Sequence, residues 1–277
     1  PKGRRSARRR LSPGPMPWTG STVSTWFHLS EELRRWSEDG RRAGLWWRDD
    51  DAKKNGLKLA RLISLAKTSR VPLAVAVIPG QVQDDLGPAF AGVPELAVLV
   101  HGLRHENFAP TGEKKSEFGP YRPVAEMLDD VAVAFETLMV LFPKLAHPVF
   151  VPPWNRIAPE LVARLPLARL RGFSQFGPRA AKNPVEGLIE VNCHVDLIDW
   201  RGKKGFVGEE LALSALIRHL RARRIGTVDE GEATGILSHH DVMDDKSWLF
   251  LAELFDRTKG SEVAHWLTVN EIFNLPK

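Results

Sequence analysis

Short apolar runs alternate with amphipathic segments along most of the chain. Runs that are apolar throughout, without a polar residue at every second position, are typical of parallel strands covered on both faces. The pattern predicts strands at 44–48, 71–78, 95–100, 147–151, 169–174, 187–193 and 233–238.

The segments between these runs have helical periodicity. At 56–68, four apolar residues are spaced to cover one side of a helix: Leu59, Leu62, Ile63 and Ala66. Further helices are predicted at 22–37, 123–142, 157–165, 208–223 and 246–258. About seven repeated strand–helix units suit a closed or nearly closed barrel better than an open sheet. We therefore predict an α/β fold, a distorted (β/α) barrel of about seven parallel strands in a single domain.

The charge of the chain is concentrated at one end. Residues 1–10 carry six positive charges, and without them the formal net charge of +5 becomes −1. We interpret residues 1–20 as a disordered basic tail and residues 21–277 as one folded domain. A disordered or artificial terminus is favoured over attraction to nucleic acid or membrane, because the body has no basic helix with interleaved aromatic residues. We expect no nucleic-acid partner.

Composition gives two further expectations. No apolar stretch approaches the roughly 20 residues that a membrane span requires, so no membrane span is expected. The single cysteine, Cys193, excludes an intrachain disulfide and suits a reducing compartment. The lack of a visible signal peptide favours a cytoplasmic location, but export stays open because the chain does not begin with Met.

Polar motifs follow several of the apolar runs. They are the acidic triplet Asp49–Asp51, His101-Gly-Leu-Arg-His105, Asp196-Leu-Ile-Asp199-Trp200 and Ser238-His239-His240-Asp241. The carboxyl ends of the strands of a barrel meet in one mouth, so these motifs are expected to form one site.

His101 and His105 are spaced for joint binding of a divalent ion, because residues i and i+4 lie on one face of a helical turn. Alone, the pair would more simply be a surface and a capping histidine. A carboxylate of the triplet supplies the missing third ligand, and two histidines with one carboxylate leave positions open for water and substrate.

Three adjacent carboxylates repel one another unless an ion or an arginine compensates them. We expect Asp51 to cap the following helix and the other two to face inward. One of these would bind the metal, and the other would take a proton from the attacking water.

With Val151-Pro-Pro-Trp-Asn155 placed between the histidines and the third motif, the set resembles the polysaccharide deacetylases of carbohydrate esterase family four. The resemblance covers about residues 45–241. It implies a distorted (β/α) barrel that uses a divalent metal, usually zinc, to remove N- or O-linked acetyl groups from sugars.

The resemblance also implies roles for single residues. Asp49 would be the catalytic base, and His239 the acid that protonates the leaving amine. One divalent ion, expected to be Zn²⁺, would be held by Asp50, His101 and His105. The positions that would bind substrate are Pro153, Trp154, Asp196, Asp199 and Trp200.

Three departures from the family pattern matter. Asp51 stands where the family usually has glycine, which leaves the register of base and ligand open. Val151 stands where the family usually has the arginine that orients the base, so Arg48 or Arg156 would have to supply that charge. His239 and the adjacent His240 point to opposite faces of a strand, so only one can be the acid, and His239 is favoured.

The expected function is metal-dependent hydrolysis of the acetyl amide (or ester) of an acetylated oligo- or polysaccharide, by a metal-activated water with an Asp base and a His acid. An inactive carbohydrate-binding relative is one alternative, favoured by the missing arginine. A metal-dependent amidase acting on a non-sugar substrate is another, favoured by the altered motifs. The presence of both histidines, two aspartates and a candidate acid favours the active deacetylase.

Overall fold

Eight parallel strands form one curled sheet, and a ninth strand pairs with the first. The computed structural model describes residues 24–276, so the tail expected at 1–20 lies outside the described residues. The order along the sheet is β6-β5-β4-β3-β2-β1-β8-β7. The strands are β1 (Ala43–Ala52), β2 (Leu73–Val77), β3 (Leu96–Val100), β4 (Ala146–Phe150), β5 (Gly172–Phe173), β6 (Ile189–Glu190), β7 (Cys193–Asp196), β8 (Thr234–Ser238) and β9 (Ala264–Trp266).

The two ends of the sheet meet through the residues that follow β5. Phe176 forms a parallel bridge with Cys193, and the Gly177 N–H donates to the Cys193 carbonyl at 2.8 Å. The predicted distorted barrel in a single domain is therefore confirmed. The sequence analysis missed β9 and joined β6 and β7 into one strand.

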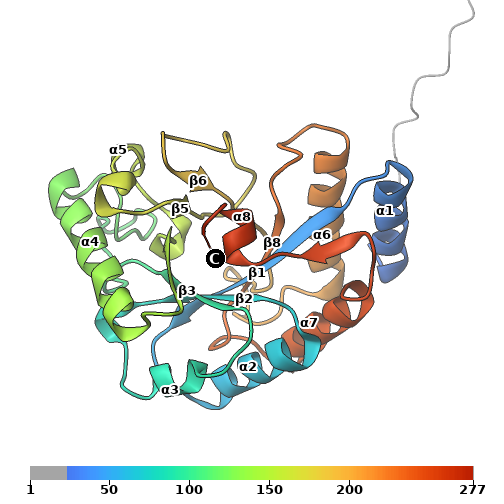
Figure 1. The fold of residues 1–277 in the computed structure, drawn as a ribbon, viewed down its shortest axis with the longest axis horizontal. Coiled ribbons are helices and arrows are strands. Elements are labelled where there is room, and N and C mark those ends of the chain that lie inside the picture. The colour runs from blue at the N-terminus through green and yellow to red at the C-terminus, as the bar shows by residue number, and fades with distance from the viewer. Residues whose placement is uncertain (1–23, 277) are drawn as a thin grey trace, which may run out of the picture.

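Helices cover much of the outer face of the sheet (Figure 1). The long ones agree with the predicted segments, and the apolar positions of the second helix are buried as expected. They are α1 (Trp26–Glu38), α2 (Leu57–Ser69), α3 (Leu86–Phe90), α4 (Val124–Leu141), α5 (Pro159–Val162), α6 (Glu209–Arg224), α7 (Asp245–Thr258) and α8 (Val269–Ile272). The short α3 and α8 were not predicted. Within residues 24–276, no helix is long and apolar enough to cross a membrane.

Successive residues of each strand point into two different apolar layers. Leu45 and Trp47 of β1 belong to the outer layer beneath the helices. Trp46 points inward, where its ring lies edge-on to Phe273 at 6.2 Å, just after α8. The inner apolar layer, which α8 joins, fills one end of the barrel, and the polar motifs lie at the carboxyl ends of the strands.

Gly235 of β8 lies at a close approach in the interior. A Cβ there would lie 2.5 Å from Trp46 Nε1 and 2.6 Å from the Asn192 carbonyl oxygen, and these two groups are hydrogen-bonded at 3.1 Å. Gly235→Ala is therefore expected to lower the free energy of unfolding by about 1–3 kcal/mol, measured by urea denaturation. Gly260→Ala is the control, because a Cβ at Gly260 would meet nothing within 4 Å. Equal losses in the two variants would contradict this account.

Candidate active site

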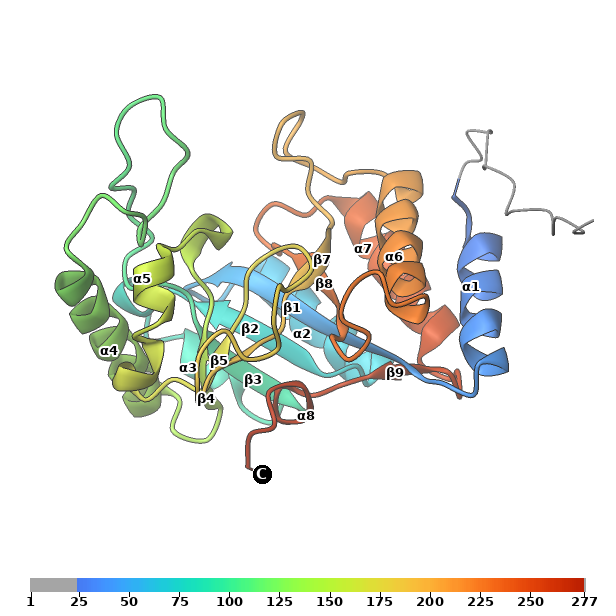
Figure 2. The ribbon, with the colours of Figure 1, turned by 90° about the horizontal axis from the view of Figure 1, so that it is seen from above.

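Side chains from four strand ends gather at one end of the barrel. The triplet Asp49–Asp51 ends β1, and His101 and His105 follow β3. Asp196 ends β7, and His239 follows β8. Figure 2 shows the long loops after β3 (green) and after β7 (gold) rising on the same side of the sheet.

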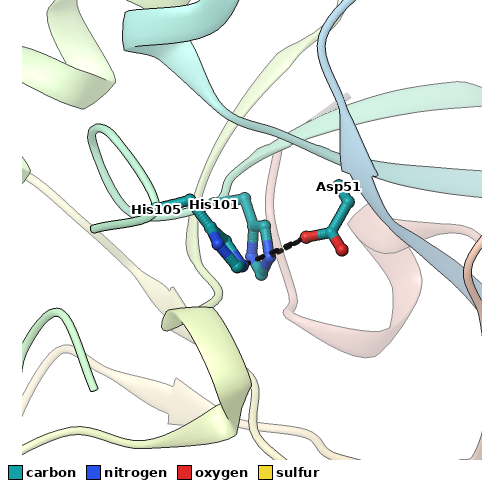
Figure 3. A group of neighbouring side chains, drawn as sticks. All are labelled: Asp51, His101 and His105. Atoms are coloured by element: carbon teal, nitrogen blue, oxygen red, sulfur yellow. Dashed lines mark hydrogen bonds and ion pairs between the residues drawn. The ribbon is translucent and has the colours of Figure 1, made fainter. Parts of the chain in front are cut away.

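Asp51, His101 and His105 point toward one another (Figure 3). Asp51 Oδ1 lies 3.0 Å from His101 Nε2 and 3.2 Å from His105 Nε2. On its other side, His101 Nδ1 lies 3.0 Å from the carbonyl oxygen of Val151. A carbonyl can only accept, so Nδ1 donates and Nε2 is the nitrogen left to ligate. This donor set fits a divalent cation such as zinc.

Electrostatics support this arrangement. Burial alone raises the pKa of Asp51, but hydrogen bonds from His101 and His105 outweigh it and hold that pKa well below its usual range. Burial is the largest single influence and lowers the pKa of His101, but the hydrogen bond to Asp51 and the charges of Asp50 and Asp51 together leave the pKa raised. The anionic oxygen of Asp51 is therefore stabilised by nearby positive charge. A bound cation would stabilise it in the same way.

The structure brings Asp51 to the histidines, whereas the sequence analysis expected Asp50 there. The segment Asp49–Ala52 spans only Val75–Val77 of β2, so β1 has one extra residue, and Asp51 has a φ of 73°. Strict alternation would send Asp51 to the same side as Asp49, and this bulge redirects it. Asp51 does not cap α2, whose N-cap residue is Gly56.

Asp50 pairs with Arg48 inside the barrel. Arg48 Nε and Nη2 donate to the two carboxylate oxygens at 2.8 and 3.0 Å, and both side chains are almost completely buried. Arg48 also donates to Ser174 Oγ at 2.6 Å and to Asn155 Oδ1 at 2.8 Å. Burial is the largest single influence and lowers the pKa of Arg48, but the charge and hydrogen bond of Asp50 together with other nearby acidic groups leave the pKa raised.

Arg48 thus places beside Asp50 the charge that is missing at Val151. Arg48 and Asp50 are two residues apart on β1, so both leave the strand on its inner side. Arg156, the other candidate, donates to the Lys115 carbonyl at 2.8 Å.

Asp49 leaves β1 on the outer side and is completely buried. It accepts hydrogen bonds from the Ser238 hydroxyl at 2.6 Å and from the His240 N–H at 3.0 Å. His240 Nδ1 lies 2.5 Å from its other oxygen. The three neighbouring aspartates therefore have three different environments, and Asp49 is turned away from the other two.

His239 lies beside Trp200, while His240 is turned toward Asp49. The rings of His239 and Trp200 are edge-on, with centroids 4.7 Å apart, and Trp200 is 43% exposed. Trp200 Nε1 donates to Asp196 Oδ2 at 2.8 Å, and burial raises the pKa of Asp196. Within the described chain, His239 Nδ1 has no hydrogen-bond partner although it is buried.

Of the other expected substrate-binding residues, Trp154 is at the site and Asp199 is not directed into it. The Trp154 ring lies 4.2 Å from the His105 ring, and its φ of 57° is part of a sharp bend after β4. Pro153 is buried next to this bend. Asp199 accepts the backbone N–H groups of residues 201 and 202, so it shapes its own loop.

Glu117 is a site residue that no sequence motif indicated. Its carboxylate accepts the backbone N–H groups of Leu103, Arg104 and His105 at 3.2, 2.8 and 3.0 Å. Burial is the main cause of its raised pKa. Glu117 lies in the long loop between β3 and α4, and it holds the segment that carries the histidines.

A second group of potential ligands, His194, His219 and Glu232, lies between the sheet and α6. The two rings are stacked with centroids 3.4 Å apart. The Gly235 N–H donates to His194 Nδ1 at 3.0 Å, so the neutral ring has its proton on Nε2, the atom facing Glu232. That nitrogen has no lone pair for a metal, and only the first of the two groups fits a cation.

Solved structures with this fold are carbohydrate esterases and deacetylases. A putative polysaccharide deacetylase from Mycobacterium smegmatis matches with a TM-score of 0.58 and 14% identity, over 85% of this chain and 90% of that one. The peptidoglycan deacetylase PdaC from Bacillus subtilis matches with a TM-score of 0.51 and 13% identity, over 84% and 91%. A mutant of BA3943, a CE4 family pseudoenzyme with restored enzymatic activity, matches with a TM-score of 0.55 and 14% identity, over 85% and 68%.

No protein-family model and no curated protein matches the sequence. The likeness is therefore one of fold. The chain has the fold of the carbohydrate esterase family four polysaccharide deacetylases, and the resemblance predicted from the motifs is confirmed at that level.

The stacked histidines predict acid sensitivity. Burial is the main cause that lowers the pKa of His194 to about 3 and of His219 to about 2. The unfolded chain binds these protons near pH 6.5, so stability is lost as the pH falls below that value, by up to about 2 kcal/mol per histidine between pH 6.5 and 5.

We expect His219→Gln to remove about half of the pH dependence of the free energy of unfolding. Urea denaturation between pH 6.5 and 5 measures it. His265→Gln, at an exposed position of β9, is the matched control. Parent and His219→Gln curves with the same slope would contradict the interpretation.

Proposed function

We propose that the protein is a metal-dependent hydrolase that removes N- or O-linked acetyl groups from a carbohydrate. The observation that carries the proposal is the convergence of three functional units at one barrel mouth. These are a two-histidine, one-carboxylate group, a carboxylate held by a buried arginine, and a histidine beside an exposed tryptophan. The deacetylases with the same fold support the choice of an acetylated oligo- or polysaccharide as substrate.

Asp51, His101 and His105 would hold the cation, with zinc as the expected metal. A divalent ion bound there would polarise the acetyl carbonyl and favour the ionisation of water. The proposal moves the ligand role from Asp50 to Asp51, because Asp51 Oδ1 is the carboxylate oxygen that faces both histidines. Glu117 supports the set through the backbone at His105.

Asp50 is the proposed base, in place of Asp49. The two hydrogen bonds from Arg48 fix the orientation of its carboxylate, which a group that accepts a proton from the attacking water requires. Asp49 is unsuited to the role because its oxygens are bonded to Ser238 and His240 on the outer side of the strand.

His239 is the proposed acid that protonates the leaving amine or alcohol. Its Nδ1 is free of protein partners within residues 24–276. Its ring lies against Trp200, whose Nε1 donates to Asp196 Oδ2. Trp154 and Trp200 would form two walls of the acetyl pocket, with the Trp154 N–H as a further oxyanion donor, and Asp199 would act through the loop that carries Trp200.

The first test separates the roles of Asp50 and Asp51. After dialysis against zinc, the parent is expected to retain about one equivalent of metal, and Asp51→Asn to lose it. Asp50→Asn should keep the metal but hydrolyse acetylated chito-oligosaccharides about 10²–10⁴-fold more slowly. Metal lost from Asp50→Asn and kept by Asp51→Asn would show that Asp50 is the cation ligand, as the sequence predicted.

The same assay separates the proposed function from its alternatives. A parent that binds metal, cleaves simple acetamides and ignores acetylated sugars would be an amidase for a non-sugar substrate. One that binds oligosaccharide without turnover would be an inactive carbohydrate-binding relative.

A second test concerns Arg48. Arg48→Lys keeps the charge but cannot donate two parallel hydrogen bonds to Asp50, so kcat is expected to fall about tenfold or more with metal content unchanged. Arg156→Lys is the matched control, because Arg156 donates to the Lys115 carbonyl. Equal activity in the two variants would show that Arg48 does not orient the base.

A further inference from the structure

Asp49 is bonded to both chain neighbours of His239. Its Oδ2 accepts the Ser238 hydroxyl at 2.6 Å and the His240 N–H at 3.0 Å, while its Oδ1 lies 2.5 Å from His240 Nδ1. Ser238 immediately precedes His239 and His240 immediately follows it. One buried carboxylate therefore holds the backbone on each side of the proposed acid.

The hydrogen bond between Asp49 and Ser238 also connects the part of the site on β1 with the part that follows β8. Asp49 and Ser238 are direct partners in the β1–β8 register, and the next two residues of β1 are Asp50 and Asp51. Trp47 Nε1 donates to Ser238 Oγ at 2.9 Å, which directs the hydroxyl proton to Asp49. The end of β8, which carries the acid, is thereby fixed against the end of β1, which carries the base and the cation ligand.

The His239 ring depends on this backbone. Its Nδ1 has no partner in the described part of the chain, so no side chain orients the ring through that atom. The His239 carbonyl accepts the N–H groups of Val242 and Met243 at 2.9 and 3.1 Å, which holds the following turn. The ring position is then set by the backbone of residues 238–243 and by the Trp200 face.

We propose that Asp49 is a positioning residue, which sets His239 opposite Asp50 through its bonds to Ser238 and His240. It does not touch the cation group, and on this geometry it meets neither the substrate nor the attacking water. The catalytic consequence rests on the proposed function, whereas the structural consequence, a fixed turn at residues 238–243, does not.

The test compares two substrates with different leaving groups. An amine needs a proton when it leaves, but 4-nitrophenolate does not, so loss of a positioned acid affects them unequally. We expect Asp49→Asn to lower kcat on N-acetylated chito-oligosaccharides about 10–100-fold, with KM changed less than threefold and metal content unchanged. Its rate on 4-nitrophenyl acetate should stay within about threefold of the parent, whereas Asp50→Asn should lose both activities.

A double-mutant cycle supplies the matched control. If Asp49 acts through His239, adding Asp49→Asn to His239→Ala causes little further loss on the oligosaccharide. Ser238→Ala, which leaves both His240 contacts to Asp49, should give a smaller loss than Asp49→Asn. Full additivity in the cycle, an equal loss on both substrates, or loss of metal from Asp49→Asn would overturn the proposal.

Backbone amide exchange keeps the proposal testable if the parent lacks deacetylase activity. The His240 N–H is bonded to Asp49, so Asp49→Ala, which leaves no acceptor, is expected to accelerate its exchange at least tenfold, with the Leu99 amide in β3 unchanged as a control for global unfolding. An unaltered His240 exchange rate would overturn the positioning role. An inactive parent with accelerated exchange would contradict only the proposed function.

Discussion

The ion pair between Arg48 and Asp50 is the interaction on which the barrel mouth depends. Both side chains are buried, and a buried charge is costly unless it is paired and hydrogen-bonded. The remaining Arg48 donors are satisfied by Ser174 after β5 and by Asn155 after β4. Three separate segments are therefore held around one guanidinium, and the Asp50 carboxylate is fixed in place by two of its hydrogen bonds.

A single bulge in β1 makes three consecutive carboxylates different. Alternation sends Asp49 outward and Asp50 inward, and the extra residue then turns Asp51 toward the histidines. The acidic triplet thus escapes the repulsion expected of it, because Asp49 faces His240, Asp50 faces Arg48 and Asp51 faces His101. One short segment can then supply the proposed positioning residue, the proposed base and the proposed cation ligand.

Loops on the barrel complete the site by satisfying backbone groups. Glu117 accepts three successive N–H groups in the segment that ends at His105, and a Cβ at Gly102, where φ is 62°, would lie 2.6 Å from Pro153 Cγ. The histidine segment, the bend at Trp154 and the loop of Glu117 therefore pack as one unit. His101 and His105 meet through this loop packing, because no regular helix connects them.

The sequence by itself determined the barrel, because hydrophobic periodicity is a local property of the chain, and the motif order predicted that His101 and His105 belong to one site. It also predicted that only one of His239 and His240 can be the acid, since adjacent strand residues point to opposite faces. Only the tertiary structure decided which aspartate faces the histidines, because the bulge that breaks alternation after Asp49 has no sequence signature. The pairing of Arg48 with Asp50, and the three amides bound by Glu117, likewise depend on segments brought together by the closed sheet.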